Sequence, residues 1–520
     1  MARSYDLTSG SIPQHLLRLA APLIMGNILQ QLYNTVDAFI LGRFAGELEF
    51  AAVGVAGSVM NLFLFMITGA CTGISVIFAQ LYGAGERERF RREHWLSLSC
   101  GLLVTLACSG LGFLLLSPLL QFIQTPSELK TFVSVYLTII LASLPAEFLY
   151  NLYGALLRAI GRANAALMAF AAAVTVNVAL DYCFVARFQL GIAGAAWATA
   201  ASQAISAVLC ILYLRRKAPE LIFARAYCRM DGELSKQTAH FSFVTALHQS
   251  SLYIGKLLVQ GAVNTGGTDM ISAYTATTRI EGFANSFGDS GSAATSVLVA
   301  QNRGAGKEER VKEPFRSSLF LMLAMSLIMY VSASTSVGFM LGTRSGAAFE
   351  NARDYLKLVA LFYTLCFTGN TFAGYFNGIG KVSVPFLGAT SHIALRVVLS
   401  WLLVGKMGPP PSRWQQASAG CWSTRCGPLS NGGWRKSRKQ QNVILCKHQK
   451  PRALRRAAFD KFCEVSPLIE MRGKGMTFLR KHEVFAHMGK PCRKRKTFVR
   501  DALCLLNFCK VKLFYNSSKW

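Results

Sequence analysis

Long apolar runs alternate with short polar connections along the chain up to about residue 405. A bilayer-spanning helix needs about 20 mainly apolar residues, and eleven of the runs are long enough. They lie at roughly 14–40, 52–80, 95–118, 131–155, 164–186, 190–214, 239–264, 269–300, 315–341, 353–378 and 382–405. This pattern predicts an all-α polytopic membrane protein.

Two pairs of motifs recur at nearly constant offsets. Gln80-Leu-Tyr-Gly-Ala-Gly is matched by Gln301-Asn-Arg-Gly-Ala-Gly, where 301 − 80 = 221. Likewise, Arg158-Ala-Ile-Gly-Arg is matched by Asn377-Gly-Ile-Gly-Lys, where 377 − 158 = 219. The duplication predicts two pseudo-symmetric six-helix bundles, an architecture in which secondary transporters bind substrate between bundles and open alternately to either side. The glycines are expected to end long helices and allow tight turns.

The repeat and a polar stretch after the sixth run divide the chain into four parts. We predict an N-terminal transmembrane lobe at 1–215, a cytoplasmic linker at 216–238, a C-terminal transmembrane lobe at 239–408 and a basic tail at 409–520. The repeat requires a twelfth helix just after Lys406, and the sequence there has no apolar run. The second bundle is therefore expected to lack its last helix.

Composition and charge agree with a membrane protein. The chain is 52% hydrophobic and only 16% charged, which is too apolar for an ordinary soluble enzyme. Every second connection is basic, and the clusters are Arg87, Arg89, Arg91 and Arg92; Arg158 and Arg162; Arg215, Arg216 and Lys217; and Arg303, Lys307, Arg310 and Lys312. By the positive-inside rule, these connections and the N-terminus are cytoplasmic in a multi-pass protein of the cell membrane.

Polar residues inside the predicted spans fall on shared helical faces. Gln30, Asn34 and Asp37 are spaced four and three apart, and Asn177 and Asp181 are spaced four apart. A carboxylate at membrane depth is costly unless it is paired or hydrated, so such residues usually face a cavity and bind ions or protons. The alternative is that each aspartate is a hydrogen-bonded structural residue near a helix end.

The chain resembles the multidrug and toxic compound extrusion (MATE) family over about residues 10–405. The resemblance depends on several motifs taken together in this order. They are Pro22 with Asn27-Ile-Leu-Gln-Gln-Leu-Tyr-Asn-Thr-Val-Asp37, Gln80 to Gly85, Leu156 to Gly161, Asn177-Val-Ala-Leu-Asp181, Gly191 to Thr199, and the second Gln-x-x-Gly-Ala-Gly at 301–306.

This resemblance implies a function. Similar proteins export amphipathic, often cationic drugs in exchange for inward sodium ions or protons, with no cofactor and no covalent chemistry, so we expect a transporter and not an enzyme. The resemblance places Asp37, Asn177, Asp181 and Thr199 in a cation or proton site of the N-terminal lobe, with sodium bound at the two aspartates if it is the coupling ion. It also implies that the first helix bends at Pro22. We expect a monomer that contacts drugs and membrane lipids and no nucleic acid.

The second half does not repeat this site. Lys256 occupies the position equivalent to Asp37, since 256 − 37 = 219. Glu281 is the natural neutralising partner of Lys256 or Arg279, and the alternative is a role for Glu281 in coupling or in binding cationic drugs.

The tail from residue 409 differs from the rest of the chain. It holds scattered cysteines without a C-x-x-C pair and basic clusters at 435–439 and 493–496. One interpretation is a basic domain that binds RNA or anionic lipid. The other is a frameshift near Gly408. When residues 411–430 are back-translated and the codons are read two bases later, the alternate frame permits an apolar peptide about one membrane span long.

Two alternative functions remain open. A lipid or lipid-linked oligosaccharide flippase of the same superfold would need a cationic cavity, whereas the predicted N-terminal cavity is acidic. A frameshifted chain without its twelfth helix could instead be an inactive transporter.

Overall fold

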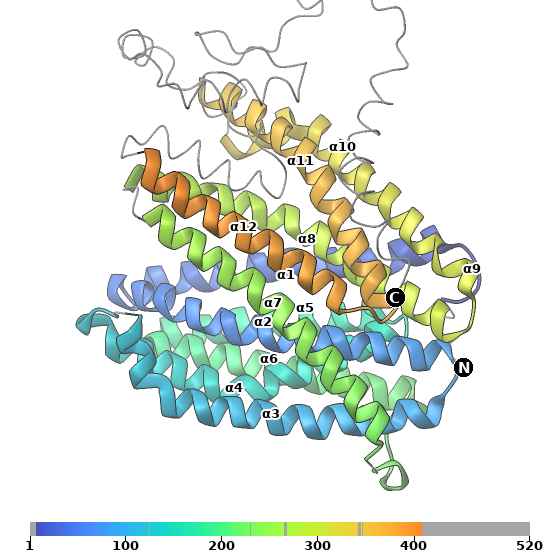
Figure 1. The fold of residues 1–520 in the computed structure, drawn as a ribbon. Helices are drawn as coiled ribbons and strands as arrows, with labels where there is room; N and C mark the ends of the chain where they lie inside the picture. The colour runs from blue at the N-terminus through green and yellow to red at the C-terminus, as the bar shows by residue number, and fades with distance from the viewer. Residues whose placement is uncertain are drawn as a thin grey trace, which may run out of the picture. The chain divides into compact units, whose positions relative to one another are not determined.

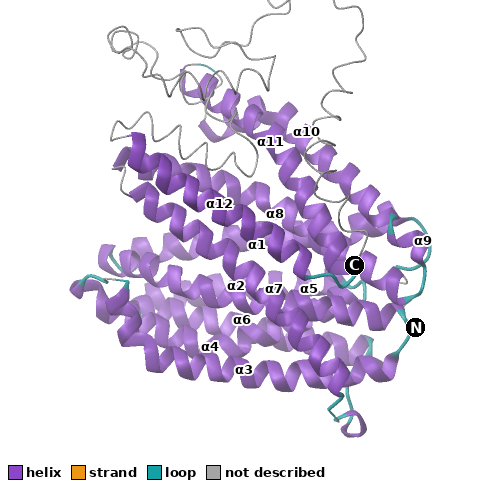
Figure 2. Cartoon of the chain, in the orientation of Figure 1, coloured by secondary structure: helices purple, strands orange, loops and turns teal. Residues whose placement is uncertain are grey.

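The computed structural model describes residues 7–123, 125–228, 230–264, 268–341, 345 and 347–407. These residues form helices and turns, and no β-strand occurs among them (Figure 2). The predicted all-α fold class is confirmed. Residues 408–520, which include the tail, lie outside the described residues, so neither interpretation of the tail is tested.

The long helices coincide with the predicted runs and extend a few residues beyond most of them (Figure 1). The first half contains α1 Ile12–Phe44, α2 Glu47–Gly83, α3 Arg87–Phe122, α4 Ser127–Ala159, α5 Ala163–Asp181, the π-helix η1 Tyr182–Arg187 and α6 Gly191–Lys217. Two short 3-10 turns follow, η2 Pro219–Leu221 and η3 Arg225–Tyr227. The second half contains α7 Gly232–Asn264, α8 Thr268–Gly304, the single turn α9 Glu308–Val311, α10 Glu313–Leu341, α11 Ala347–Gly378 and α12 Ser383–Met407.

Within the described residues, six helical segments are long and apolar enough to cross a membrane by length and composition alone. They are Glu47–Gly83, Arg87–Gln121, Ser127–Ala159, Ala163–Arg187, Gly191–Lys217 and Glu308–Ser332. Helix α7 is one of the long helices outside this set, and it carries the polar residues His248 and Lys256.

Four long helices, α2, α4, α8 and α11, end in the same turn. Each turn places a glycine at a positive φ of +69° to +77°, and these glycines are Gly85, Gly161, Gly306 and Gly380. The residue after each glycine donates its N–H back to a carbonyl five residues earlier, at 2.8–3.1 Å. This pattern is the Schellman C-cap, which favours glycine because a Cβ is strained at positive φ. The predicted role of the glycines as helix ends is confirmed.

Helices α2 and α7 pack closely through glycines of α2. A Cβ added at Gly73 would lie 2.6 Å from the carbonyl oxygen of Phe241, and one added at Gly69 would lie 2.6 Å from that of Thr245. Small residues allow transmembrane backbones to approach this closely. The first bundle is thereby joined to the first helix of the second half.

We expect Gly73→Ala to destabilise the protein by about 1–3 kcal/mol, because the new methyl group would overlap backbone atoms of α7 that cannot move independently. Gly54→Ala is the matched control, since nothing lies within 4 Å of a Cβ at that position of the same helix. Thermal unfolding in detergent measures the effect. Equal melting temperatures for the two variants would contradict the packing described.

Helix α6 is held at its start by a carboxylate from α2. Glu49 accepts a hydrogen bond from the backbone N–H of Ile192, in the first turn of α6. An acceptor at this position satisfies a backbone donor that the helix leaves free and complements the positive end of the helix dipole. Thr199 lies seven residues further on, about two turns along the same face.

Candidate cation site in the first bundle

Three helices supply the predicted site residues. Asp37 comes from α1, Asn177 and Asp181 from α5, and Thr199 from α6. Asn177 and Asp181 are fully buried, Thr199 is 4% exposed and Asp37 is half-buried. The carboxyl groups of Asp37 and Asp181 are close enough to interact electrostatically. The structure therefore brings together two acidic groups that are 144 positions apart in the chain, since 181 − 37 = 144.

Most polar atoms of these side chains have no hydrogen-bond partner in the structure. The unpartnered buried atoms are Oδ1 of Asp37, both carboxylate oxygens of Asp181 and both polar side-chain atoms of Asn177. The carboxyl group of Asp181 receives no hydrogen bond from other described side chains and interacts with that of Asp37. Buried polar groups are almost always satisfied, so a cluster of unpartnered carboxylate and amide atoms is a candidate site for an ion, a proton or water. Carboxylate and amide oxygens fit a hard cation such as sodium.

Two tyrosines that the sequence analysis did not single out complete the site. The hydroxyl of Tyr33 lies 2.9 Å from the hydroxyl of Thr199 and links α1 to α6. Tyr33 also interacts with Asp37 and Asp181. Tyr136, buried in α4, lies within electrostatic range of the same two aspartates, and its hydroxyl donates to Sδ of Met60 at 3.7 Å.

Helix α5 changes its winding at the site. Asp181 is the last α-helical residue, and the π-helix Tyr182–Arg187 begins directly after it. Single π turns within helices are rare and occur frequently at functional sites, because the wider turn redirects backbone and side chains. The geometry around Asp181 follows this pattern.

The remaining predicted residues of α1 lie outside the unpartnered cluster. Gln30 donates to Oδ1 of Asn34 at 3.2 Å on a more exposed part of the helix. Pro22 is buried, and α1 continues through it. Five residues after Pro22, Asn27 donates to the hydroxyl of Ser290 in α8 at 3.0 Å. The helix that holds Asp37 is therefore also bonded to the second half of the chain.

The residues predicted for the second half are only partly described. Lys256 lies on α7 with an exposed side chain. Glu281 and Arg279 fall within α8, but their side chains lie outside the described residues, so the predicted ion pair is not tested. In the described part of the chain, no group of three or more His, Cys, Asp or Glu side chains could hold a metal ion.

Long apolar helices built from a duplicated unit, with a buried carboxylate pair in the first half, define a polytopic membrane transporter. The MatE family model matches residues 22–183 and 243–402. The starts of the two matches differ by 221 positions and their ends by 219, the same offsets as the motif pairs. The chain belongs to the MatE family, whose members are transporters and use coupling ions rather than cofactors.

Relatives and solved structures agree with this family. The chain is 25% identical over 408 residues to "Probable multidrug resistance protein YpnP" of Bacillus subtilis, covering 77% of this chain and 88% of that protein. It is 23% identical over 390 residues to a NorM protein of Thermotoga maritima described as a multidrug resistance protein, covering 72% and 82%. A crystal structure of a MATE protein in the bent conformation matches with a TM-score of 0.73 at 18% identity, covering 86% of this chain and 99% of that one.

Proposed function

We propose that the chain is a cation-coupled antiporter that exports amphipathic, cationic compounds in exchange for inward sodium ions or protons. The observation that supports this most directly is the Asp37–Asp181 pair, in which Oδ1 of Asp37 and both carboxylate oxygens of Asp181 are buried without a hydrogen-bond donor from another residue. Relatives named for multidrug resistance support small-molecule drugs as the substrate class.

The residues around the pair supply the chemistry that exchange requires. Two carboxylates in a poorly solvated place repel one another, so the pair readily takes up one proton or one sodium ion. The Asn177 amide and the Tyr33–Thr199 hydroxyl pair offer further oxygens to that ion. Once the pair is neutralised, it no longer attracts a cationic drug. Cation uptake on one side and drug release then become one linked event.

Helix α1 provides a route from the site to the second half. Asp37 lies on this helix, and Asn27 bonds to Ser290 and to the backbone oxygen of Ser286 in α8. Pro22 has no backbone N–H, so one hydrogen bond is missing inside α1. The helix therefore bends more easily near this residue. Cation binding at Asp37 and Asp181 can therefore change the contacts between the two halves through α1.

The flippase alternative receives less support. A site for lipid-linked pyrophosphate should be rich in arginine and lysine, because phosphate oxygens need cationic donors. The described cluster in the first bundle contains two carboxylates and neutral polar groups. An inactive, frameshifted transporter remains the second candidate, because the sequence repeat requires a helix after Lys406 and no apolar run follows there.

Drug accumulation in cells that express the chain tests the proposal. We expect lower accumulation of a fluorescent cationic dye than in control cells, and the difference should disappear when the sodium and proton gradients are both collapsed. Export that continues unchanged without either gradient would exclude coupled antiport.

We expect Tyr33→Phe to weaken cation affinity several-fold, because the Tyr33–Thr199 hydrogen bond contributes about 1 kcal/mol and orders the third helix of the site. Drug binding should change less, since the substitution retains the aromatic ring. Titration of purified protein with sodium and with a cationic dye measures both affinities. Tyr182→Phe, at an exposed position of η1, is the matched control. An equal loss of dye affinity would count against a cation-specific role.

The orientation of the chain is also a prediction. Arg216, in the last turn of α6, and Glu47, at the start of α2, are both exposed in the structure, so each is replaced by a single cysteine. Because the basic connections are expected to be cytoplasmic, a membrane-impermeant maleimide should label the Glu47→Cys variant in intact cells and the Arg216→Cys variant only after permeabilisation. Labelling of Arg216→Cys in intact cells, and of Glu47→Cys only after permeabilisation, would show that the chain has the opposite orientation in the membrane.

A further inference from the structure

The duplicated Gln-x-x-Gly motifs meet each other at the end of the helices where the basic connections lie. The amide of Gln80, near the end of α2, donates to the backbone oxygen of Gly378, the last residue of α11, at 3.1 Å. The amide of Gln301, near the end of α8, donates to the backbone oxygen of Ala159, the last residue of α4. Each glutamine therefore reaches across to a helix of the opposite half.

The two bonds are related by the sequence repeat. The donors are separated by 301 − 80 = 221 positions and the acceptors by 378 − 159 = 219. The last carbonyls of a helix have no partner within the helix, so both acceptors are groups that need a donor from elsewhere. Each half of the protein thus satisfies a helix end of the other half with the same side chain.

The glycines of the same motifs make this contact possible. A Cβ added at Gly83 would overlap the backbone oxygen of Gln301, and one added at Gly304 would overlap that of Gln80. No side chain fits at either position. Gly83 leaves room for the backbone of Gln301, and Gly304 leaves room for the backbone of Gln80. The ends of α2 and α8 can touch only while both positions are glycine.

The N-terminal segment adds a second connection between the halves at this end. Lys307 donates to the backbone oxygen of Thr8 at 2.8 Å, and Arg310 donates to that of Gly10 at 2.9 Å. These donors lie just after α8, whereas Thr8 and Gly10 lead directly into α1. The connection is exposed to solvent, whereas Gln301 is fully buried.

We propose that Gln80, Gly83, Gln301 and Gly304 form a symmetric cytoplasmic latch that closes the transporter between the two halves and must open for the inward-facing state. The proposal rests on alternating access, as set out under the proposed function. Two side-chain hydrogen bonds and the close crossing of α2 and α8 hold the latch, and Lys307 and Arg310 add the exposed connection to the N-terminal segment. Bonds from water can replace hydrogen bonds of this kind, so the latch is suited to repeated opening. When it opens, water replaces the two amides at Gly378 and Ala159, as it does at most exposed helix ends.

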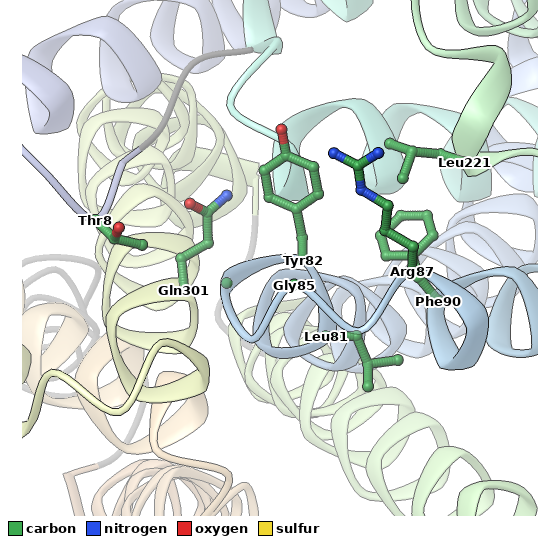
Figure 3. A pocket seen from close by; sticks show the side chains of 9 residues that line it. Thr8, Leu81, Tyr82, Gly85, Arg87, Phe90, Leu221 and Gln301 are labelled. Carbon is green, nitrogen blue, oxygen red and sulfur yellow. The ribbon is translucent and has the colours of Figure 1, made fainter.

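A pocket borders the latch at two of its residues, Gly83 and Gln301. Figure 3 shows Thr8 and Gln301 on one side of this pocket and Tyr82 and Arg87 on the other. The side-chain oxygen of Gln301 has no hydrogen-bond partner, so the amide is fixed only through its nitrogen.

A distance measurement tests the latch without requiring transport. Nitroxide labels at Arg216→Cys in the first half and Glu309→Cys in the second, both exposed positions, report the separation of the halves by pulsed electron resonance. The full chain is used in lipid nanodiscs, with the other cysteines replaced by serine. Latch variants are Gln80→Ala and Gln301→Ala, which remove one bond each, and Gly83→Ala and Gly304→Ala, which force the backbones apart.

We expect the ratio of long to short distances to rise at least tenfold in all four latch variants, and by similar amounts within each symmetric pair. Gln121→Ala and Gly57→Ala are the matched controls, because Gln121 is exposed and no atom lies within 4 Å of a Cβ at Gly57. They should retain the parental distribution. The latch is refuted if the glutamine variants keep that distribution, even when the glycine variants shift. If the distance distribution shifts in the latch variants but the parent chain shows no coupled export, the latch is upheld and the proposed function is rejected.

Discussion

Asp37→Asn and Asp181→Asn should each abolish coupled drug export, lowering the rate by about 100-fold or more, or roughly 3 kcal/mol. Each substitution removes one of the two carboxylates that bind the coupling ion and leaves a neutral amide of nearly the same shape. The remaining carboxylate no longer has a like charge beside it, so its affinity for a cation falls. Export into medium with an imposed sodium or pH gradient measures the loss.

These variants should fold and insert normally. The oxygens of Asp181 are buried without a hydrogen-bond donor from another described residue, so removing their charge relieves a desolvation cost. We expect melting temperatures equal to or above that of the parent. Glu88→Gln, an exposed position in the first turn of α3, is the matched control and should export at the parental rate. Glu281→Gln should reduce coupling less than either aspartate variant, because we assign Glu281 mainly to an ion pair.

Parental export by both aspartate variants, with unchanged dependence on sodium and pH, would show that the coupling site lies elsewhere. Glu281 would then be the leading residue to test. Loss of protein from the membrane, in contrast, would show that the aspartates have a structural role.

Restoring the alternate reading frame after Gly408 should convert a poorly expressed or inactive chain into an active exporter. The repeat requires a twelfth helix, and lipid would otherwise fill a groove shaped for small residues of a neighbouring helix. Several residues of the alternate peptide are nearly independent of codon choice, for example alanine across Trp414 and Gln415 and leucine across Cys421 and Trp422. Protein yield and dye export, compared between the two reading frames, measure the gain.

Equal export by both forms would show that the 409–520 tail is compatible with function. Truncation after Gly408 is the control that separates the two effects. If the tail itself is harmful, truncation alone restores export, whereas a missing helix leaves the truncated form inactive. Sequencing the gene across codons 400–430 also decides whether an apolar alternate frame exists.

The positions of the helices follow from the sequence because the bilayer makes apolar length decisive. Runs such as 52–80 and 131–155 became α2 and α4 with only a few residues added at each end. The added residues include charged ones, such as Glu47 and Arg158, and apolar ones, such as Leu81 and Leu156, so hydropathy alone does not place the helix ends. The ends at Gly85 and Gly306 were readable because glycine at positive φ has a specific structural role.

The candidate site could be predicted only in part from the sequence. Residue spacing shows which side chains share a helical face, but it does not show which helices face each other. Asp37 and Asp181 were found because charges are rare in apolar runs. Tyr33 lies one turn before Asp37 and could have been included on spacing alone. Tyr136 belongs to an ordinary apolar run, and only the packing of α4 against the site brings it near both aspartates.

The latch shows the same limit. Gln80 and Gln301 were recognised as parts of a repeated helix end, but a repeat cannot show that each glutamine binds a helix end of the opposite half. That relation depends on how the two bundles meet around their pseudo-twofold axis. The three-dimensional structure supplies it through the bonds to Gly378 and Ala159.

Counterflow in proteoliposomes tests the central claim most directly. Vesicles containing the purified protein are loaded with a cationic dye, and sodium uptake and proton uptake are recorded as the dye leaves. The account predicts that dye efflux drives uptake of one of these cations in a fixed ratio, and that Asp37→Asn and Asp181→Asn abolish the uptake. Dye efflux with no cation uptake, or uptake that survives both substitutions, would contradict it.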